Sequence, residues 1–243
     1  MILNIDAGNS RIKWRLTDNG QQMAEGVQLT SETVEGKLLS LPDKSRPSEI
    51  RIACVAGDEI IDLLQQQLAK QFSVPILLAQ VSSVLGELSC AYEDPQSLGV
   101  DRWLAIAAAY HKYSEPLMVV DAGSAITIDI IGPGGQHIGG YIAPGLRLMH
   151  DALWKNTSDV RVVGSGLEEL WLPGKNTKQA VNRGCLLAAV STIESLAAQF
   201  PVRIVLTGGD AKILMQAINL SADYHANLVL DGLVIDGVEL SGI

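Results

Sequence analysis

A five-residue string near the start of the chain recurs about halfway along it, and this repeat constrains the fold more than any other feature. Asp-Ala-Gly-Asn-Ser occupies positions 6–10, and Asp-Ala-Gly-Ser-Ala occupies positions 121–125. Each copy is a short acidic segment that contains glycine and lies between two apolar runs. The chain of 243 residues therefore divides into two related halves, and we expect two domains, residues 1–113 and 114–243.

The residues that flank each string alternate between apolar and polar types. This alternation covers residues 11–17 after the first string and residues 126–130 after the second. A period of two indicates a half-buried strand rather than a helix. Both strings are therefore predicted to form the turns of β-hairpins.

Further strands and helices follow each hairpin. In the first half we expect strands over residues 21–29, 50–55 and 75–79, and helices over residues 59–72 and 100–113. In the second half we expect strands over residues 138–142 and 203–206, and helices after residue 145, over 177–200 and from 211 to about 218. Strands that alternate with helices predict an α/β fold.

The two hairpin turns are candidates for binding a nucleotide. Neither G-x-G-x-x-G nor G-x-x-x-x-G-K-[ST] occurs in the chain. A hairpin turn can still hold an anion, because Gly8 and Gly123 permit positive φ and close approach, so that successive N–H groups converge on phosphate oxygens. An adjacent aspartate would repel phosphate unless a cation lay between them, so we expect Mg²⁺ to accompany the nucleotide. Single Asp-x-Gly turns are commonly structural, but two copies in matching contexts favour the functional interpretation.

Composition excludes several other classes of function. The chain has 18 Lys and Arg against 27 Asp and Glu, and no basic segment, which disfavours nucleic acid as a partner. Cys54, Cys90 and Cys185 form no C-x-x-C pair, as expected for reduced thiols in the cytoplasm. No basic leader and no uncharged apolar run of about 18 residues is present, so we expect no membrane partner. A small molecule is the expected substrate.

Three further segments each allow two interpretations. Asp101 and Arg102 follow Gly99 at a predicted helix start, where Asp101 could cap the helix or remove a proton from a substrate hydroxyl while Arg102 binds a carboxylate. Residues 207–210 are either a structural turn or a place where adenosine lies against bare backbone. Residues 139–145 are either a bend in the sheet or a wall of the substrate pocket.

Taken together, these motifs resemble those of type III pantothenate kinases, within the acetate and sugar kinase, Hsp70 and actin superfamily. The resemblance covers essentially the whole chain. It is carried by residues 6–13, 99–102, 121–124, 139–145, 176–177 and 207–210.

The resemblance implies a fold and an activity. The fold would consist of duplicated actin-like (ribonuclease H-like) domains, each a mixed sheet that begins with a β-hairpin and is flanked by helices, with the nucleotide cleft between them. The activity would be ATP-dependent phosphorylation of pantothenate to 4′-phosphopantothenate, the first step of coenzyme A biosynthesis. The family is typically a homodimer, with the substrate bound close to the subunit interface.

The resemblance also assigns roles to individual residues. Asp101 would be the general base, Asp6 would lie near Mg²⁺, and Asp121 would bind an activating monovalent cation, K⁺ or NH₄⁺. The implied ATP contacts are Asp6, Ala7, Gly8, Asn9, Ser10, Arg11, Ile12, Lys13, Ser124, Gly208 and Gly209. The implied pantothenate contacts are Tyr92, Gly99, Val100, Asp101, Arg102 and Thr177. Ser124 stands where the family usually has Thr, and the hydroxyl is retained.

Two other functions are compatible with such a fold. One is an ATP-driven conformational switch, but the chain is short and the segment 99–102 provides chemistry on an acceptor that a switch does not need. The other is a kinase or an acetyl-phosphate enzyme for a different small acid.

Overall fold

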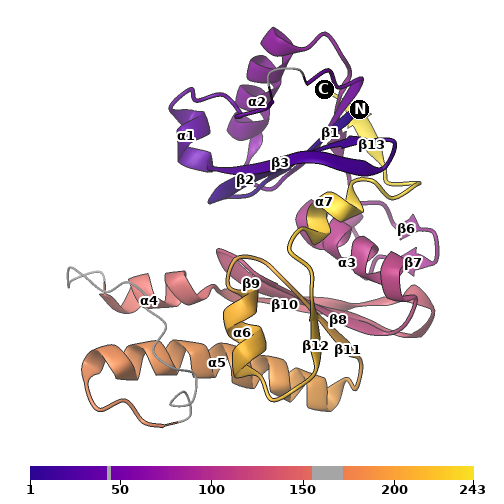
Figure 1. The fold of residues 1–243 in the computed structure, drawn as a ribbon. Coiled ribbons are helices and arrows are strands. Elements are labelled where there is room, and N and C mark those ends of the chain that lie inside the picture. Colours follow the sequence, from indigo (N-terminus) through magenta and orange to yellow (C-terminus); the bar gives the residue numbers. More distant parts are fainter. Residues whose placement is uncertain (43–44, 155–171) are drawn as a thin grey trace. The chain divides into compact units, whose positions relative to one another are not determined.

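The computed structural model describes residues 1–42, 45–154 and 172–243, which divide into two compact units (Figure 1). The first unit contains Met1–Lys112 and Leu228–Ile243, and the second contains Tyr113–Asn227. The sequence-based boundary puts residues 228–243 in the second half, whereas the structure groups them with the first unit. The reason is that β13 (Leu240–Gly242) pairs with β5 (Ile76–Ala79), and α7 (Leu228–Gly232) packs against β1 (Ile2–Ala7).

The first unit is built on a mixed sheet of six strands in the order β13-β5-β4-β1-β2-β3. The remaining strands are β2 (Arg11–Asp18), β3 (Gln21–Leu29) and β4 (Glu49–Cys54). Strands β1, β2 and β3 form an antiparallel meander, and β4 and β5 continue from β1 in parallel. The predicted first hairpin is confirmed.

The second unit repeats this order in a sheet of five strands, β10-β9-β8-β11-β12. These are β8 (Leu117–Ala122), β9 (Ala125–Ile131), β10 (His137–Pro144), β11 (Arg203–Thr207) and β12 (Ala222–Tyr224). Here too the first three strands are antiparallel and the next two are parallel to the first. The repeat in the sequence is therefore a repeat of the whole β3-β2-β1-β4-β5 arrangement.

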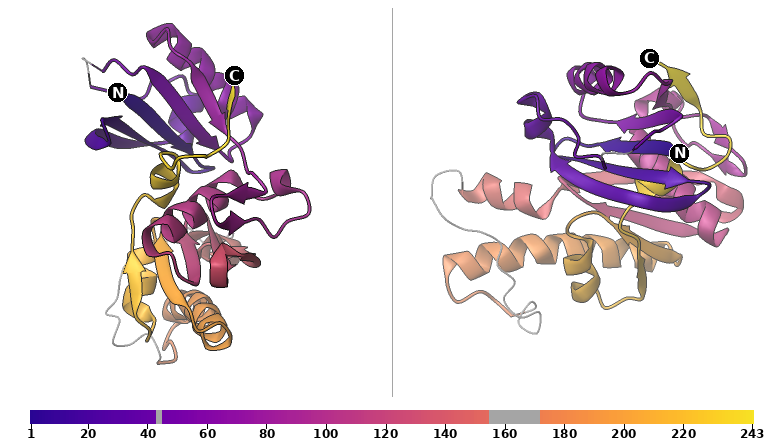
Figure 2. Two further views of the ribbon diagram at one scale, coloured as in Figure 1. Left: turned by 90° about the vertical axis from the view of Figure 1, so that its right-hand side faces the viewer. Right: turned by 45° about the horizontal axis from the view of Figure 1, so that its top comes forward.

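Each sheet buries one face under helices, as the views in Figures 1 and 2 show. Ile60, Leu64 and Leu68 of α2 (Asp58–Gln71) join the first core, which includes β1 and β2. Residues of α5 (Thr177–Gln199) and α6 (Ala211–Ala217) join the second core. The other helices are α1 (Thr30–Val34), α3 (Val100–Tyr113) and α4 (Leu146–Trp154).

Several short elements were not predicted from the sequence. They are β12, β13 and α7, the small hairpin of β6 (Val84–Leu85) and β7 (Leu88–Ser89), and the 3₁₀ turns Pro95–Ser97 and Pro133–Gly135. None is long enough to show a periodic pattern. Within residues 1–42, 45–154 and 172–243, no helix is both long and apolar enough to cross a membrane.

One tight contact shows how closely the first sheet is packed. The ring of the buried Trp14 on β2 lies over Gly26, its partner on β3. A Cβ atom at position 26 would lie 2.5 Å from Cζ2 of that ring. The absence of a side chain at Gly26 is therefore what allows the indole to lie flat against the sheet.

We predict that Gly26→Ala destabilises the protein by about 1–3 kcal/mol, because the added methyl group forces the indole or the strand to move. The midpoint of urea denaturation, followed by circular dichroism, measures the effect. The matched control is Gly184→Ala in α5, where an added Cβ meets nothing within 4 Å. That change should stabilise by about 0.5–1 kcal/mol, and equal shifts in the two variants would contradict the packing argument.

Candidate functional site

The first hairpin loop, residues 8–10, joins β1 to β2. Asp6 lies on β1 directly opposite Lys13 on β2, so an acidic and a basic residue are cross-strand neighbours at the base of the loop. The N–H group of Gly8 donates to the carbonyl oxygen of Arg11 across the loop at 3.0 Å. The loop carbonyl groups of Gly8 and Ser10 both accept hydrogen bonds from Thr30, the first residue of α1.

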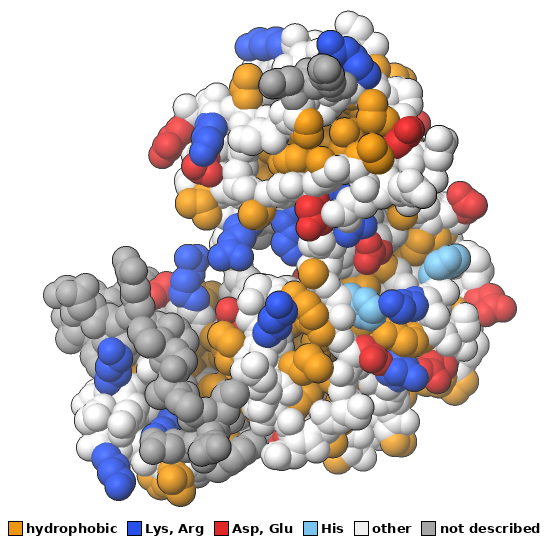
Figure 3. Space-filling view, viewed as in Figure 1, with side chains coloured by type: hydrophobic (Ala, Val, Ile, Leu, Met, Phe, Trp, Pro, Cys, Tyr) orange, Lys and Arg blue, Asp and Glu red, His pale blue; other side chains and the backbone are white. Residues whose placement is uncertain are grey.

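One face of β2 carries a row of positive charges. Arg11, Lys13 and Arg15 share this face because side chains alternate along a strand. Arg15 forms an ion pair with Asp231 of α7 at 2.5 Å. On the face of the molecule seen in Figure 3, Lys and Arg side chains lie among Asp and Glu. The row on β2 places three basic side chains on one face of a strand, in a chain with a net charge of −9.

The second hairpin loop, residues 123–124, joins β8 to β9. Asp121 lies on β8 between Thr127 of β9 and Thr207 of β11. A Cβ atom at Gly208 would lie 2.3 Å from the carboxylate oxygen Oδ1 of Asp121. The structure thus brings together two predicted site residues, since Gly208 is the position that leaves room for the Asp121 carboxylate.

The expected backbone conformation of the loop glycines is wrong. Neither Gly8 nor Gly123 has φ in the left-handed region. Gly123 instead donates its N–H group to the carbonyl oxygen of Ala125 at 2.9 Å, as Gly8 does to Arg11. These two N–H groups are committed within their own loops, so amide donors for an anion have to come from neighbouring residues.

A second group of predicted residues meets at the start of α3. Gly99 precedes the helix, and a Cβ there would lie 2.7 Å from Oδ1 of Asp101. That oxygen accepts the backbone N–H group of Arg102 at 2.8 Å, so Asp101 does bond to the helix start. The guanidinium group of Arg102 is buried, donates to the hydroxyl of Tyr92 at 3.1 Å and lies 5.8 Å from the centre of its ring. Tyr92, Asp101 and Arg102 therefore form one acid-and-arginine cluster.

The remaining predicted residues lie at the edges of these groups. Ala7 and Ile12 are buried partners at the ends of β1 and β2, and Asn9 is exposed at the tip of the first hairpin loop. Val100 is the first residue of α3. In the second unit, Ser124 is exposed in its loop and Gly209 in the turn after β11. Thr177 is exposed at the first position of α5, behind the cap Asn176.

The structure also adds a residue beside Asp6 that the sequence did not single out. Cys54 follows Ala53, the partner of Asp6 on β4. Burial raises the pKa of the Cys54 thiol, and the negative charges of Asp6 and Asp58 raise it further. The charge of Asp6 is thus one of several influences on the ionisation of Cys54. No local sequence signal could have shown this, because the contact depends on strand pairing.

Comparisons with known proteins agree on one family. A sequence model of the type III pantothenate kinase family matches residues 2–199. A type III pantothenate kinase of Teredinibacter turnerae is 37% identical over 246 residues, covering 97% of this chain and 98% of the relative. Another, of Acinetobacter baumannii, is 36% identical and covers 94% of each chain.

Comparison of structures supports the same fold. A Campylobacter jejuni protein described as a Baf family transcriptional activator superposes with a TM-score of 0.60 at 24% identity, covering 95% of this chain and 94% of the other. The ethanolamine utilization protein EutJ of Carboxydothermus hydrogenoformans gives a TM-score of 0.54 at 11% identity, with 95% and 88% covered. At this level of identity the likeness shows the fold alone. The predicted duplicated actin-like fold is confirmed.

We predict that Asp6→Asn lowers the pKa of Cys54, because it removes a negative charge that disfavours the thiolate. Alkylation of Cys54 by iodoacetamide at about pH 8, measured peptide by peptide with mass spectrometry, should become faster. Cys185 is an internal control, since burial raises its pKa and no carboxylate contributes. Unchanged labelling of Cys54 in the Asp6→Asn protein would show that the two groups do not interact.

Proposed function

The chain belongs to the type III pantothenate kinase family, and from that premise we propose which role each site residue has in the reaction. Enzymes of this family are kinases that transfer a phosphoryl group from ATP to pantothenate in coenzyme A biosynthesis, and this chain has that activity. The observation that carries the assignment of residues is the acid-and-arginine cluster at the start of α3, which combines a proton acceptor with a binder of carboxylate.

Phosphate binding is assigned to the two hairpin loops. Residues 6–13 would hold the phosphates of ATP, supported by the positive charge of Arg11 and Lys13 on one face of β2. Ser124 would contribute its hydroxyl from the second hairpin loop. Gly208 and Gly209, in the turn after β11, would let the adenosine approach the backbone.

Two cations complete the proposed nucleotide site. The Asp6 carboxylate suits Mg²⁺, and Asp121 suits K⁺ or NH₄⁺, since all of these prefer oxygen ligands. Within the described parts of the chain, no three His, Cys, Asp or Glu side chains gather as a metal cage. This fits Mg²⁺, which commonly binds through one or two carboxylates, water and substrate phosphates. When bound, it would neutralise charge on the phosphates.

The substrate is assigned to the cluster at α3. Arg102 would bind the carboxylate of pantothenate, because a guanidinium has five N–H donors and its bond to Tyr92 is compatible with a bidentate grip. Tyr92 would hold the Arg102 head in place and contact the substrate. Gly99 and Val100 would line the same site, and Thr177 would supply a further contact.

Asp101 is assigned the role of general base. The pantothenate hydroxyl oxygen would attack the γ-phosphorus of ATP, the bond from that phosphorus to the bridging oxygen would break, and the hydroxyl proton would pass to the Asp101 carboxylate. One carboxylate oxygen is hydrogen-bonded to the helix start, which fixes the orientation of the group. Positioning of this kind supplies much of the rate in phosphoryl transfer.

We predict that the purified protein phosphorylates pantothenate with Mg²⁺-ATP, faster in K⁺ than in Na⁺, and that Asp101→Asn lowers kcat by at least about 100-fold. The amide keeps the shape but cannot accept the proton, so the dissociation constant for ATP should stay within about twofold. Coupled ADP release and isothermal titration calorimetry measure the two quantities.

The matched control is Asp94→Asn in the neighbouring loop. Asp94 accepts the backbone N–H group of Gln96, and asparagine can do the same. This variant should retain its kcat. A near-normal kcat for Asp101→Asn would remove Asp101 from the role of base, and ADP release without any need for pantothenate would favour an ATP-driven switch.

We also propose that the enzyme is a cytoplasmic homodimer. All three cysteines are unpaired, as is usual in a reducing compartment. Large apolar side chains are exposed on α4 and α5, which pack against each other, namely Leu148, Leu153 and Leu187. Exposed apolar residues grouped on neighbouring helices are typical of protein interfaces.

Light scattering after gel filtration should therefore give twice the mass of one chain. Leu148→Glu combined with Leu153→Glu should shift the protein to a monomer, because burying two carboxylates in an apolar interface is costly. Met215→Glu, at an exposed position of α6, is the control and should leave the mass unchanged. A dimer that survives the double change would place the interface elsewhere.

A further inference from the structure

Thr30 makes two hydrogen bonds to the first hairpin loop, although it lies 20 residues beyond the loop in sequence. Its backbone N–H group donates to the carbonyl oxygen of Ser10 at 3.1 Å. Its hydroxyl donates to the carbonyl oxygen of Gly8 at 2.7 Å. The side chain is buried, with 7% of the residue exposed, so water competes little for these bonds. Thr30 therefore fixes the orientation of two of the peptide groups in the loop.

Fixing these carbonyl groups also fixes the N–H groups that share their peptide planes. In a trans peptide the C=O and N–H bonds point in opposite directions. The Gly8 carbonyl shares its plane with the N–H group of Asn9, and the Ser10 carbonyl shares its plane with that of Arg11. Both N–H groups are therefore directed away from Thr30. They can replace the Gly8 N–H group, which is committed within the loop, as donors to an anion.

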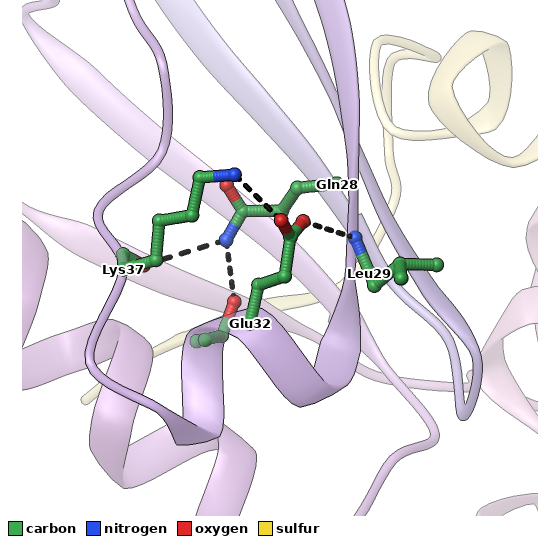
Figure 4. A network of polar contacts seen from close by, with 5 residues as sticks. Gln28, Leu29, Glu32 and Lys37 are labelled. Carbon is green, nitrogen blue, oxygen red and sulfur yellow. Dashed lines mark hydrogen bonds and ion pairs between the residues drawn. The ribbon is translucent and has the colours of Figure 1, made fainter.

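A network of polar contacts surrounds the short helix α1, whose first residue is Thr30 (Figure 4). Glu32 accepts the backbone N–H group of Leu29 at 3.0 Å and the ammonium group of Lys37 at 2.6 Å. The bond from Lys37 and then the bond from Leu29 lower the pKa of Glu32. Gln28 donates to the hydroxyl of Thr33 at 2.6 Å. A five-residue helix is not stable alone, so these contacts keep Thr30 at the loop.

The second unit repeats the contact at the equivalent position. The N–H group of Gly145, directly before α4, donates to the carbonyl oxygen of Ser124 at 3.1 Å. A Cβ atom at Gly145 would lie only 2.4 Å from the carbonyl oxygen of Gly123. In the second unit the backbone thus touches the glycine carbonyl directly. In the first unit, whose loop is one residue longer, the hydroxyl of Thr30 reaches it instead.

We propose that Thr30 is a positioning residue for ATP: by holding the Gly8 and Ser10 carbonyl groups, it presents the Asn9 and Arg11 N–H groups to the phosphates. This inference rests on the proposed role of the first hairpin loop. Thr30 does not touch the nucleotide and acts only through the loop.

The test compares Thr30→Val, which removes the hydroxyl and keeps the branched shape, with Thr30→Ser, which keeps the hydroxyl. Thr30→Val should raise the KM for ATP about tenfold, the effect of one lost hydrogen bond, and leave the KM for pantothenate within twofold. Thr30→Ser should return the KM for ATP to within about threefold of the original value. Thr17→Val is the matched control, because it removes a buried hydroxyl that donates to the carbonyl oxygen of Ile2, at the end of β1 and β2 away from the loop.

A role limited to stability would give a different result. Thr30→Val and Thr17→Val would then both lower the melting temperature, and neither would change the KM for ATP selectively, which would overturn the proposal. Thr30→Ala repeats the test if the valine variant folds poorly. Calorimetric titration with Mg²⁺-ATP alone separates this inference from the proposed function, since a weakened ATP affinity in Thr30→Val supports the inference even if pantothenate is not the acceptor.

Discussion

The structure depends on one type of contact, a hydrogen bond from the start of a helix back into a hairpin loop. Thr30 makes it to Ser10 in the first unit and Gly145 makes it to Ser124 in the second. In both units the third strand of the meander carries the chain to the loop, because that strand ends beside the start of the second strand. The loop is therefore held by the sheet on one side and by a helix start on the other, which suits a loop that has to keep its N–H groups oriented.

The aspartates at the base of the two hairpins have the same strand pairing but different neighbouring residues. The pairing of β1 with β4 puts Ala53 beside Asp6, and the pairing of β8 with β11 puts Thr207 beside Asp121. The next residue is Cys54 in one case and Gly208 in the other. Gly208 leaves space that the Asp121 carboxylate fills, whereas Cys54 occupies the corresponding place near Asp6.

The sequence predicted what repeats along the chain and missed what depends on contacts between distant segments. Alternating residues identified both hairpins, and apolar spacing identified the long helices. β13 and α7 were not predicted, because each is short and forms by packing or pairing with distant strands of the first sheet. The expectation of positive φ at Gly8 and Gly123 was wrong. Gly8 allows close approach to the Arg11 carbonyl, with a Cβ distance of 3.2 Å, rather than positive φ. Thr30 was missed because strand pairing alone brings it to the loop.

The two hairpins have diverged in charge while keeping their geometry. Ala7 pairs with Ile12 as Ala122 pairs with Ile126, so Lys13 corresponds to Thr127. By the same register, Arg11 corresponds to Ala125. The first hairpin therefore has two basic residues, Arg11 and Lys13, near its aspartate. The second hairpin has no basic residue at the corresponding positions, 125 and 127. This difference between the hairpins is compatible with the proposal that Asp121 binds a monovalent cation supplied from solution.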